Sequence, residues 1–253
     1  MVAVEFRLKL SSAYSIRVPY SYQCARTYPL PAPSTIKGLC ANALWRVDGG
    51  NPVDIIKRIH DTSLGATSRS EYAIAVSPCT VRVIPMNALL RQFAFTPYID
   101  CMIVLKNGAE NLGKKIAEAL KASPVYLGDS ESLVSILPNS VEVIKNYEDF
   151  KEGDMITGNS VVKFDFIKEK SINEKGVVLY MQDNPCNIDA VLERYIAPLK
   201  QNGDSYEPLN SLSFIAAKKG LIVKGKSVHG IFSNEQQEPA DVQKPKRSKK
   251  KKA

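Results

Sequence analysis

The chain has 253 residues, 44% of them apolar, which is enough to bury a substantial core as one large domain or two small ones. Its formal charge is +8, but seven of its 34 basic residues lie in residues 244–252, so the body holds 27 basic against 26 acidic residues. No apolar stretch reaches the length of a membrane span and the first ten residues do not form a signal-peptide pattern, so we expect a soluble, cytoplasmic protein without membrane contact.

The charge of the body is unevenly distributed. Residues 1–125 hold 15 basic and 8 acidic side chains, whereas residues 126–243 hold 12 and 18. This asymmetry is typical of one lobe that faces an anion and another that faces a different partner, such as a basic protein. Uneven surface charge without a function is equally consistent with the counts.

The cysteines predict neither disulfides nor a metal site. They are odd in number, widely spaced and without a CxxC pair, so we interpret them as buried thiols in a reducing cytosol. No metal or other cofactor is predicted. They are Cys24, Cys40, Cys79, Cys101 and Cys186.

The first predicted element is a half-buried strand at residues 2–10, where Val4, Phe6 and Leu8 alternate with charged residues. From Phe6 to Val47 the chain carries six Arg or Lys residues, four Tyr and no Asp or Glu. Clustered cations without carboxylates favour a polyanion, and tyrosines add surfaces on which unpaired bases stack.

A proline-rich loop follows, and an apolar stripe at helical spacing predicts a helix over residues 34–47 with Ser34 as its N-cap. Gly49 and Gly50 end this helix, and residues 52–60 are predicted to form a second, short one. The prolines can be explained by structure alone, because they hold the chain in the extended conformation that leads into the helix. As an additional function, a helix N-terminus with Lys37 in its first turn is suited to a phosphate.

Further elements follow in an order shared by many RNA-binding folds. Strand, helix, strand, strand, helix, strand is the ferredoxin-like arrangement, and it places the chain in the α+β class. An apolar connection joins the second and third strands. These later elements are strands at 72–84, 97–105 and 140–144 and a helix at 111–122.

The remainder of the chain is predicted to be mostly β-structure. We expect strands at 161–167, 176–181 and 221–223 and a helix at 188–195. The expected organisation is a ferredoxin-like domain at 1–150, a smaller β-rich region at 151–233 and a disordered basic tail at 234–253. The tail is either a solvated charge run or a nonspecific helper of nucleic-acid binding.

Three ordered motifs resemble those of a known family. They read Pro31-Ala-Pro-Ser-Thr-Ile-Lys-Gly-Leu39, then Arg91-Gln-Phe93 leading to Pro97-Tyr98, then Tyr126-Leu-Gly-Asp-Ser-Glu131. Over about residues 2–135 the chain resembles the fifth CRISPR-associated (Cas) family. This family is the RAMP-type subunit that holds the 5′ handle of the guide RNA (crRNA) in type I Cascade complexes.

The resemblance implies a noncatalytic crRNA-binding subunit that holds the repeat-derived 5′ handle and caps the backbone filament, for guide-directed DNA interference in antiviral defence. It implies a ferredoxin-like (RRM/RAMP-type) domain with an extended β-hairpin, the thumb, at about residues 79–95. The implied partners are the Cascade backbone subunit, the large subunit and, through the complex, target DNA. The simple thumb resembles archaeal type I-A members.

The candidate RNA contacts fall on the loop, the first helix and the thumb. Arginine and lysine are assigned to phosphates and tyrosine to stacking on bases. An apolar thumb tip suits a wedge that displaces a base, although such residues equally fill a core. The candidates are Arg17, Tyr20, Arg26, Tyr28, Ser34, Thr35, Lys37, Arg82, Met86 and Arg91.

Two alternatives remain open. A metal-independent endoribonuclease that processes CRISPR precursor RNA needs a general base, for which the chain offers His60 and His229, with Lys37 stabilising charge. His60 ends a predicted helix and is better interpreted as a capping or surface residue, and His229 follows a glycine-containing loop whose contact with RNA is in doubt. The second alternative is a general single-stranded RNA-binding protein.

Overall fold

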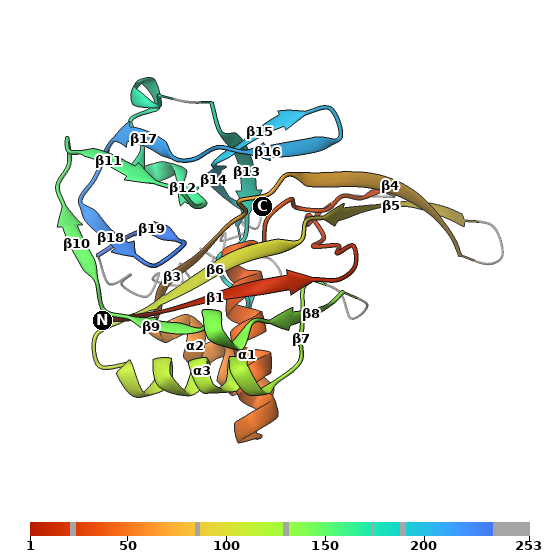
Figure 1. Cartoon of the computed structure of the whole chain (residues 1–253), viewed down its shortest axis with the longest axis horizontal. Coiled ribbons are helices and arrows are strands. Elements are labelled where there is room, and N and C mark those ends of the chain that lie inside the picture. The colour runs from red at the N-terminus through yellow and green to blue at the C-terminus, as the bar shows by residue number, and fades with distance from the viewer. Residues whose placement is uncertain (21–23, 84–86, 129–131, 174, 188–190, 235–253) are drawn as a thin grey trace, which may run out of the picture.

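Strand β1 (Val2–Leu10) forms the centre of the largest sheet in Figure 1. The structure is a computed structural model that describes residues 1–20, 24–83, 87–128, 132–173, 175–187 and 191–234; for 81–83 and 87–89 only the backbone is described. β1 pairs antiparallel with β6 (Tyr98–Leu105), and β3 (Ser63–Arg69) lies beyond β6. The other edge of β1 pairs with β8 (Leu133–Ile136) and β9 (Glu142–Ile144), and β7 (Val125–Tyr126) follows β8.

Both faces of this sheet are covered. Three helices cover one face in Figure 1, namely α1 (Pro33–Asp48), α2 (Pro52–Thr62) and α3 (Glu110–Ala122). On the other face, Ala3 of β1 belongs to an apolar cluster with Leu221, Val223 and Phe232. The prediction of a half-buried strand is therefore wrong for residues 2–6, because residues far along the chain cover the side that was expected to face water.

The N-cap of helix α1 lies two residues earlier than predicted. Ala32 occupies the N-cap position without a side-chain hydrogen bond, and Pro33 is the first helical residue, where its fixed backbone angle fits. Ser34 therefore lies inside the helix, and its assignment as N-cap is wrong. Helix α2 has the side-chain cap that α1 lacks, since Asn51 accepts a hydrogen bond of 3.0 Å from the backbone amide of Val53.

A long hairpin projects from the body in Figure 1. Its strands are β4 (Ile74–Val83) and β5 (Asn87–Phe95), paired from Ala75 with Phe95 to Val83 with Asn87. The apolar connection expected before Pro97 is thus largely a strand. The hairpin joins a sheet of order β15-β16-β4-β5-β2, in which the remaining strands are β15 (Leu199–Asn202), β16 (Ser205–Pro208) and β2 (Cys24–Ala25).

The last third of the described chain is built from short strands and 3₁₀ turns. Glu193 to Tyr195 belong to β14, so the helix expected over residues 188–195 is wrong there, and residues 188–190 lie outside the described chain. The strands are β10 (Tyr147–Phe150), β11 (Met155–Gly158), β12 (Val162–Lys163), β13 (Val177–Met181), β14 (Glu193–Ala197), β17 (Leu212–Ile215), β18 (Gly220–Lys224) and β19 (His229–Phe232). The turns are η1 (Pro138–Ser140), η2 (Phe164–Phe166) and η3 (Glu169–Ser171).

The cysteine prediction is correct for two residues and wrong for two. Cys40 and Cys101 are buried, whereas Cys79 on the hairpin and Cys186 are exposed. Within the described residues, no helix combines the length and apolar character needed to cross a membrane.

A buried carboxylate joins the first strand to the end of the fold. Glu5 is 4% exposed, and its oxygens accept hydrogen bonds of 2.7, 2.8 and 2.7 Å from the backbone amides of Lys226, Ser227 and Val228. A β-carbon at Gly225 would stand 2.5 Å from Glu5 Oε2, so the loop closes on the carboxylate only with glycine there. The loop between β18 and β19 is therefore folded around Glu5.

We expect Glu5→Gln to lower the free energy of unfolding by about 2–3 kcal/mol, because an amide replaces a charged acceptor and directs N–H groups at backbone donors. Urea unfolding measures the loss. The matched control is Glu142→Gln, whose partner Lys226 lies 3.7 Å away at the surface; its cost should be about 0.5 kcal/mol or less. Equal losses in the two variants would contradict the role given to Glu5.

Candidate nucleic-acid interface

The acid-free loop after β1 is part of the hairpin sheet. Its two arms pair with each other, since Val18 donates to the carbonyl of Arg26 and Tyr28 donates to that of Ile16, each at 2.9 Å. Tyr14 exchanges two hydrogen bonds of 2.8 Å with Ala94 of β5, and β2 pairs in parallel with β5. The loop is therefore anchored to the base of the hairpin.

Several of the predicted RNA-contacting side chains on this loop face water. Arg17 and Arg26 are exposed, and Tyr20 is 72% exposed with a positive φ of 60°, which is unusual for a residue with a side chain. Arg91 of β5 is half-buried, and its guanidinium lies 4.8 Å from the ring centroid of Phe93. These positions are consistent with the predicted contacts to phosphates and bases.

The Tyr-Leu-Gly motif is packed onto the same loop. Gly128 has φ +89°, and a β-carbon there would stand 2.3 Å from the backbone oxygen of Ser15, so no other residue fits. Leu127 is buried, and its amide donates to the carbonyl of Ser132 at 2.9 Å. Ser132 Oγ in turn accepts from the amide of Ser15 at 3.3 Å. Residues 129–131 of the motif lie outside the described chain.

The loop, the start of α1 and this motif enclose one hollow of about 410 Å³, which we call the Arg17–Tyr126 hollow. Three segments that are far apart in the sequence thus meet at one place. Thr35, one of the predicted contacts, lies in it. Its lining residues are Ile16, Arg17, Thr35, Gly38, Leu39, Asn42, Tyr126 and Gly128.

The assignment of Lys37 to an RNA phosphate is wrong. Lys37 is 1% exposed, and its Nζ donates to Asp183 Oδ2 at 2.7 Å and to the Asp183 carbonyl at 3.2 Å. His60 Nδ1 lies 3.3 Å from the same nitrogen. Burial lowers the pKa of Lys37 while Asp183 opposes that shift, and burial with the Lys37 charge lowers the pKa of His60. His60, which ends the second helix predicted from the sequence, thus lies beside the Lys37–Asp183 ion pair.

Tyr28 is also unable to stack on a base. It is 4% exposed, its hydroxyl donates to the carbonyl of Tyr180, and burial raises its pKa to about 12. The amide of Ser34 donates to the carbonyl of Gln182 at 3.1 Å. Residues 180–183 therefore cover the start of α1, and the phosphate site predicted at that helix N-terminus is occupied by the chain itself.

Other candidates are not brought together as sequence reasoning expected. The backbone of His229 donates to Asn159 Oδ1 at 2.7 Å and accepts from Ser160 Oγ at 3.0 Å, whereas Lys37 is bonded to Asp183. In the glycine-containing loop before His229, three backbone amides donate hydrogen bonds to the carboxylate of Glu5. The side chain of Arg82 and all of Met86 lie outside the described residues.

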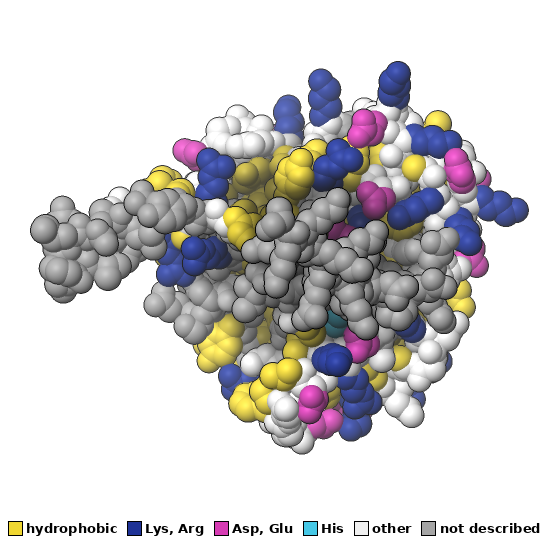
Figure 2. Space-filling model, turned by 180° about the vertical axis from the view of Figure 1, so that it is seen from behind, with side chains coloured by type: hydrophobic (Ala, Val, Ile, Leu, Met, Phe, Trp, Pro, Cys, Tyr) yellow, Lys and Arg dark blue, Asp and Glu magenta, His cyan; other side chains and the backbone are white. Residues whose placement is uncertain are grey.

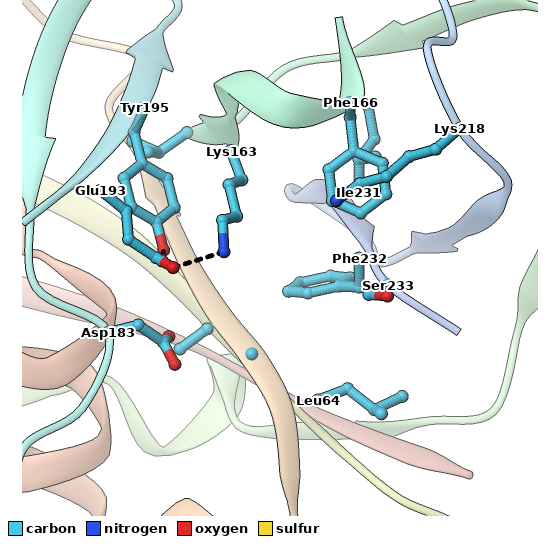
Figure 3. Close-up of a pocket in the computed structure, with 13 residues that line it drawn as sticks. Leu64, Lys163, Phe166, Asp183, Glu193, Tyr195, Lys218, Ile231, Phe232 and Ser233 are labelled. Atoms are coloured by element: carbon cyan, nitrogen blue, oxygen red, sulfur yellow. Dashed lines mark hydrogen bonds and ion pairs between the residues drawn. The ribbon is translucent and has the colours of Figure 1, made fainter. Parts of the chain in front are cut away.

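A larger cavity of about 590 Å³ lies between β3 and the last third of the chain (Figure 3). Lys163 Nζ contacts Glu193 Oε1 at 2.6 Å, and the hydroxyl of Tyr195 donates to Glu193 Oε2 at 3.1 Å. Lys218 Nζ lies 4.4 Å from the ring centroid of Phe166 and 4.0 Å from a carboxylate oxygen of Asp165. The charged side chains of this cavity thus already have partners in the chain.

Sequence reasoning missed the acidic residues that matter here. Asp183 and Glu193 come from the acidic half of the chain, and the only signal for them was the uneven distribution of charge. On the face shown in Figure 2, acidic and basic side chains are interspersed. Among the described residues, no group of three His, Cys, Asp or Glu side chains is arranged to hold a metal ion.

Comparison with known proteins places the chain in a family. The family model described as CRISPR-associated protein (Cas_Cas5) matches residues 5–195. The chain therefore belongs to this CRISPR-associated family, which confirms the resemblance of its motifs. No curated protein matches the chain.

Solved structures show a related fold. A CRISPR protein from Archaeoglobus fulgidus matches with a TM-score of 0.58 and 14% identity, covering 93% of this chain and 100% of its own. A chain of a CRISPR RNA-guided surveillance complex has a TM-score of 0.43 and 14% identity, covering 85% and 90%. A chain of a Type III-B Cmr-beta complex bound to cognate target RNA has a TM-score of 0.43 and 9% identity. The match covers 83% of this chain and 86% of that chain. Only the first score is high enough to show a shared fold.

We expect Asp183→Ala to lower the free energy of unfolding by about 3–5 kcal/mol, because it leaves a buried ammonium without its anion. Lys37→Met should cost less, since the Asp183 side chain is 26% exposed and water can reach it. Urea unfolding of both variants and of the double variant, which should cost less than the sum, tests the pair. The control is Asp48→Ala, which breaks an exposed pair of 2.9 Å with Lys115. A loss no larger than that of the control would show that the buried pair is unimportant.

Proposed function

We propose that the chain is a noncatalytic crRNA-binding subunit of a type I CRISPR Cascade surveillance complex, holding the repeat-derived 5′ handle. The family match supports a CRISPR-complex subunit. The observation that carries the RNA-binding role is the Arg17–Tyr126 hollow, where the acid-free loop, the start of α1 and the Tyr-Leu-Gly turn meet. Two of the three family-like motifs contribute to this concave surface, and the third, the Arg91 motif, lies on the hairpin.

The strand order supports the ferredoxin-like description of the N-terminal part. β3, β6, β1 and β8 lie side by side in that order and are antiparallel throughout, with α1 following β1 and α3 following β6. This is the order expected when two strand-helix-strand halves interleave. Its second and fourth strands are β3 and β8, and not the strands expected at 72–84 and 140–144. The β4–β5 hairpin extends from it where the thumb was expected.

The physical chemistry of the loop suits single-stranded RNA. Arg17 and Arg26 can neutralise phosphates and release counterions, and the exposed ring of Tyr20 offers a face for a base. Since the loop is paired to β5, these groups and Arg91 sit on one connected sheet. A single strand of RNA bound by these groups would run between the loop and the hairpin.

The remaining roles are part of the same proposal. The subunit would cap the backbone filament, contact the backbone and large subunits and reach target DNA through the complex. The acidic second half of the chain would face protein neighbours. We further propose a cytoplasmic location and an archaeal type I-A origin.

The noncatalytic assignment is supported by the state of Lys37, the residue expected to stabilise charge in the endoribonuclease alternative, because its ammonium is buried and bonded to Asp183. We expect purified protein to leave repeat RNA intact over hours, as judged by denaturing gel electrophoresis. Specific cleavage that disappears in His229→Ala would establish the endoribonuclease alternative instead.

We expect Arg17→Ala combined with Arg26→Ala to weaken binding of the RNA that copurifies with the native chain roughly tenfold, with little change in melting temperature. The slope of log affinity against log salt should fall by about one for each phosphate that the variant no longer neutralises. Fluorescence anisotropy over a range of salt concentrations measures both quantities.

The matched control is Lys151→Ala with Lys170→Ala, which removes the same charge from exposed positions in the last third of the chain. Equal effects of the two double variants would remove the loop from the interface. Equal affinity of the native protein for unrelated RNAs would favour the general RNA-binding alternative.

A further inference from the structure

Gly38 lies in the interior of α1 without a packing reason. A β-carbon at this position would meet no other described atom within 4 Å, in contrast to Gly128, where one would collide with Ser15. Glycine weakens a helix interior relative to alanine because it loses more backbone entropy on folding. The packing of the free chain therefore does not require glycine here, whereas an external group that approaches the helix backbone closely would.

Two hollows meet at this glycine. The Arg17–Tyr126 hollow lies on one side, and a second hollow of about 300 Å³ lies between α1 and α2 on the other. Gly38 and Asn42 line both. The second is lined by Gly38, Ala41, Asn42, Trp45, Pro52, Val53 and Ile56. Because the two hollows share Gly38 and Asn42, we consider them together and call them the α1 groove.

Trp45 provides a flat surface in the groove. Its side chain is 38% exposed, and its Nε1 donates to the carbonyl of Gly50 at 3.1 Å, which orients the indole. Val53, 66% exposed, lies across the same hollow. A fixed indole beside an aliphatic side chain is suited to a planar ring that stacks on it.

The charges around the groove favour a polyanion over a protein segment. Arg17 lines one end. Arg46 Nε donates to Asn42 Oδ1 at 3.0 Å, and its guanidinium lies 5.6 Å from the ring centroid of Tyr126. Among the described residues, the lining of both hollows includes Arg17 and no carboxylate. Cations at the rim, an aromatic floor and continuity with the proposed RNA interface identify the occupant as a single nucleic-acid strand.

We propose that the α1 groove binds single-stranded RNA, with the sugar-phosphate backbone crossing α1 at Gly38 and an unpaired base stacked on Trp45. This inference rests on the proposed RNA-binding function and extends it from the Arg17–Tyr126 hollow to a second subsite between α1 and α2. Because any base can stack on an indole, we expect this subsite to add affinity and to direct the path of the RNA strand, with little sequence preference. A side chain at position 38 would separate the RNA strand from the backbone of α1.

The experiment uses the only tryptophan of the chain as its reporter, because the emission of Trp45 is quenched when a base stacks on it. The probe is the RNA that copurifies with the native protein, made synthetically. Native protein should show saturable quenching that follows binding measured independently by anisotropy. Trp45→Leu should bind about tenfold more weakly.

Gly38→Ala and Gly38→Leu separate binding from folding. We expect Gly38→Ala to raise the urea midpoint while lowering RNA affinity several-fold, and Gly38→Leu to lower affinity about tenfold. Controls are Ala122→Leu, which adds an exposed leucine to α3, and Tyr147→Leu, which removes an exposed ring from β10. Both should bind as the native chain does.

The outcomes distinguish the two proposals. RNA binding without quenching, or RNA binding unchanged in Trp45→Leu and both Gly38 variants, would overturn the groove. The proposed function would then stand only if the Arg17→Ala, Arg26→Ala double variant still weakens RNA binding. Absence of RNA binding by the native chain would overturn both. Quenching by another Cas subunit, with none by RNA, would show that the groove is a protein-docking surface and would also overturn the inference.

Discussion

The buried ion pair between Lys37 and Asp183 is the interaction on which the arrangement of the candidate interface depends. An ammonium that is 1% exposed is tolerated only with a close anion and further acceptors, and the carboxylate and carbonyl of Asp183 supply them. Because Lys37 is in the first turns of α1 and Asp183 follows β13, the pair ties together segments 146 residues apart. It thereby fixes the part of α1 that carries Thr35 and Gly38.

Internal groups occupy the helix start at which the sequence predicts a phosphate, and also the glycine-containing loop for which RNA contact was in doubt. The carbonyls of Gln182 and Asp183 accept hydrogen bonds from the start of α1, and Glu5 accepts hydrogen bonds from three amides of the loop after β18. A helix start and a glycine-containing loop attract negative charge for the same reason whether the charge is a phosphate or a carboxylate. At both places the acceptor belongs to the chain itself.

Much of the fold could be predicted from local sequence patterns. The elements that were predicted wrongly or not at all share one cause. The apolar stripes of α1 and α3 depend on residues three and four apart, so sequence alone located both helices to within about a residue. β3 was missed because Ser63–Arg69 is rich in small and polar residues that become buried between β6 and the last third of the chain. The helix expected near Tyr195 has helical spacing, but β12 and β13 pair with that segment from either side. In each case tertiary pairing outweighed the local pattern.

The candidate interface was predictable only where exposure follows from a position on a loop. Arg17, Tyr20 and Arg26 lie on a loop and remain accessible, whereas Lys37 and Tyr28 are buried by residues 180–183, which no local pattern reveals. The hollow itself required knowledge of one close backbone approach, at Gly128 against Ser15. Since that contact involves backbone atoms, it holds Ser15 and Ile16 of the loop against the Tyr-Leu-Gly turn independently of side-chain conformation.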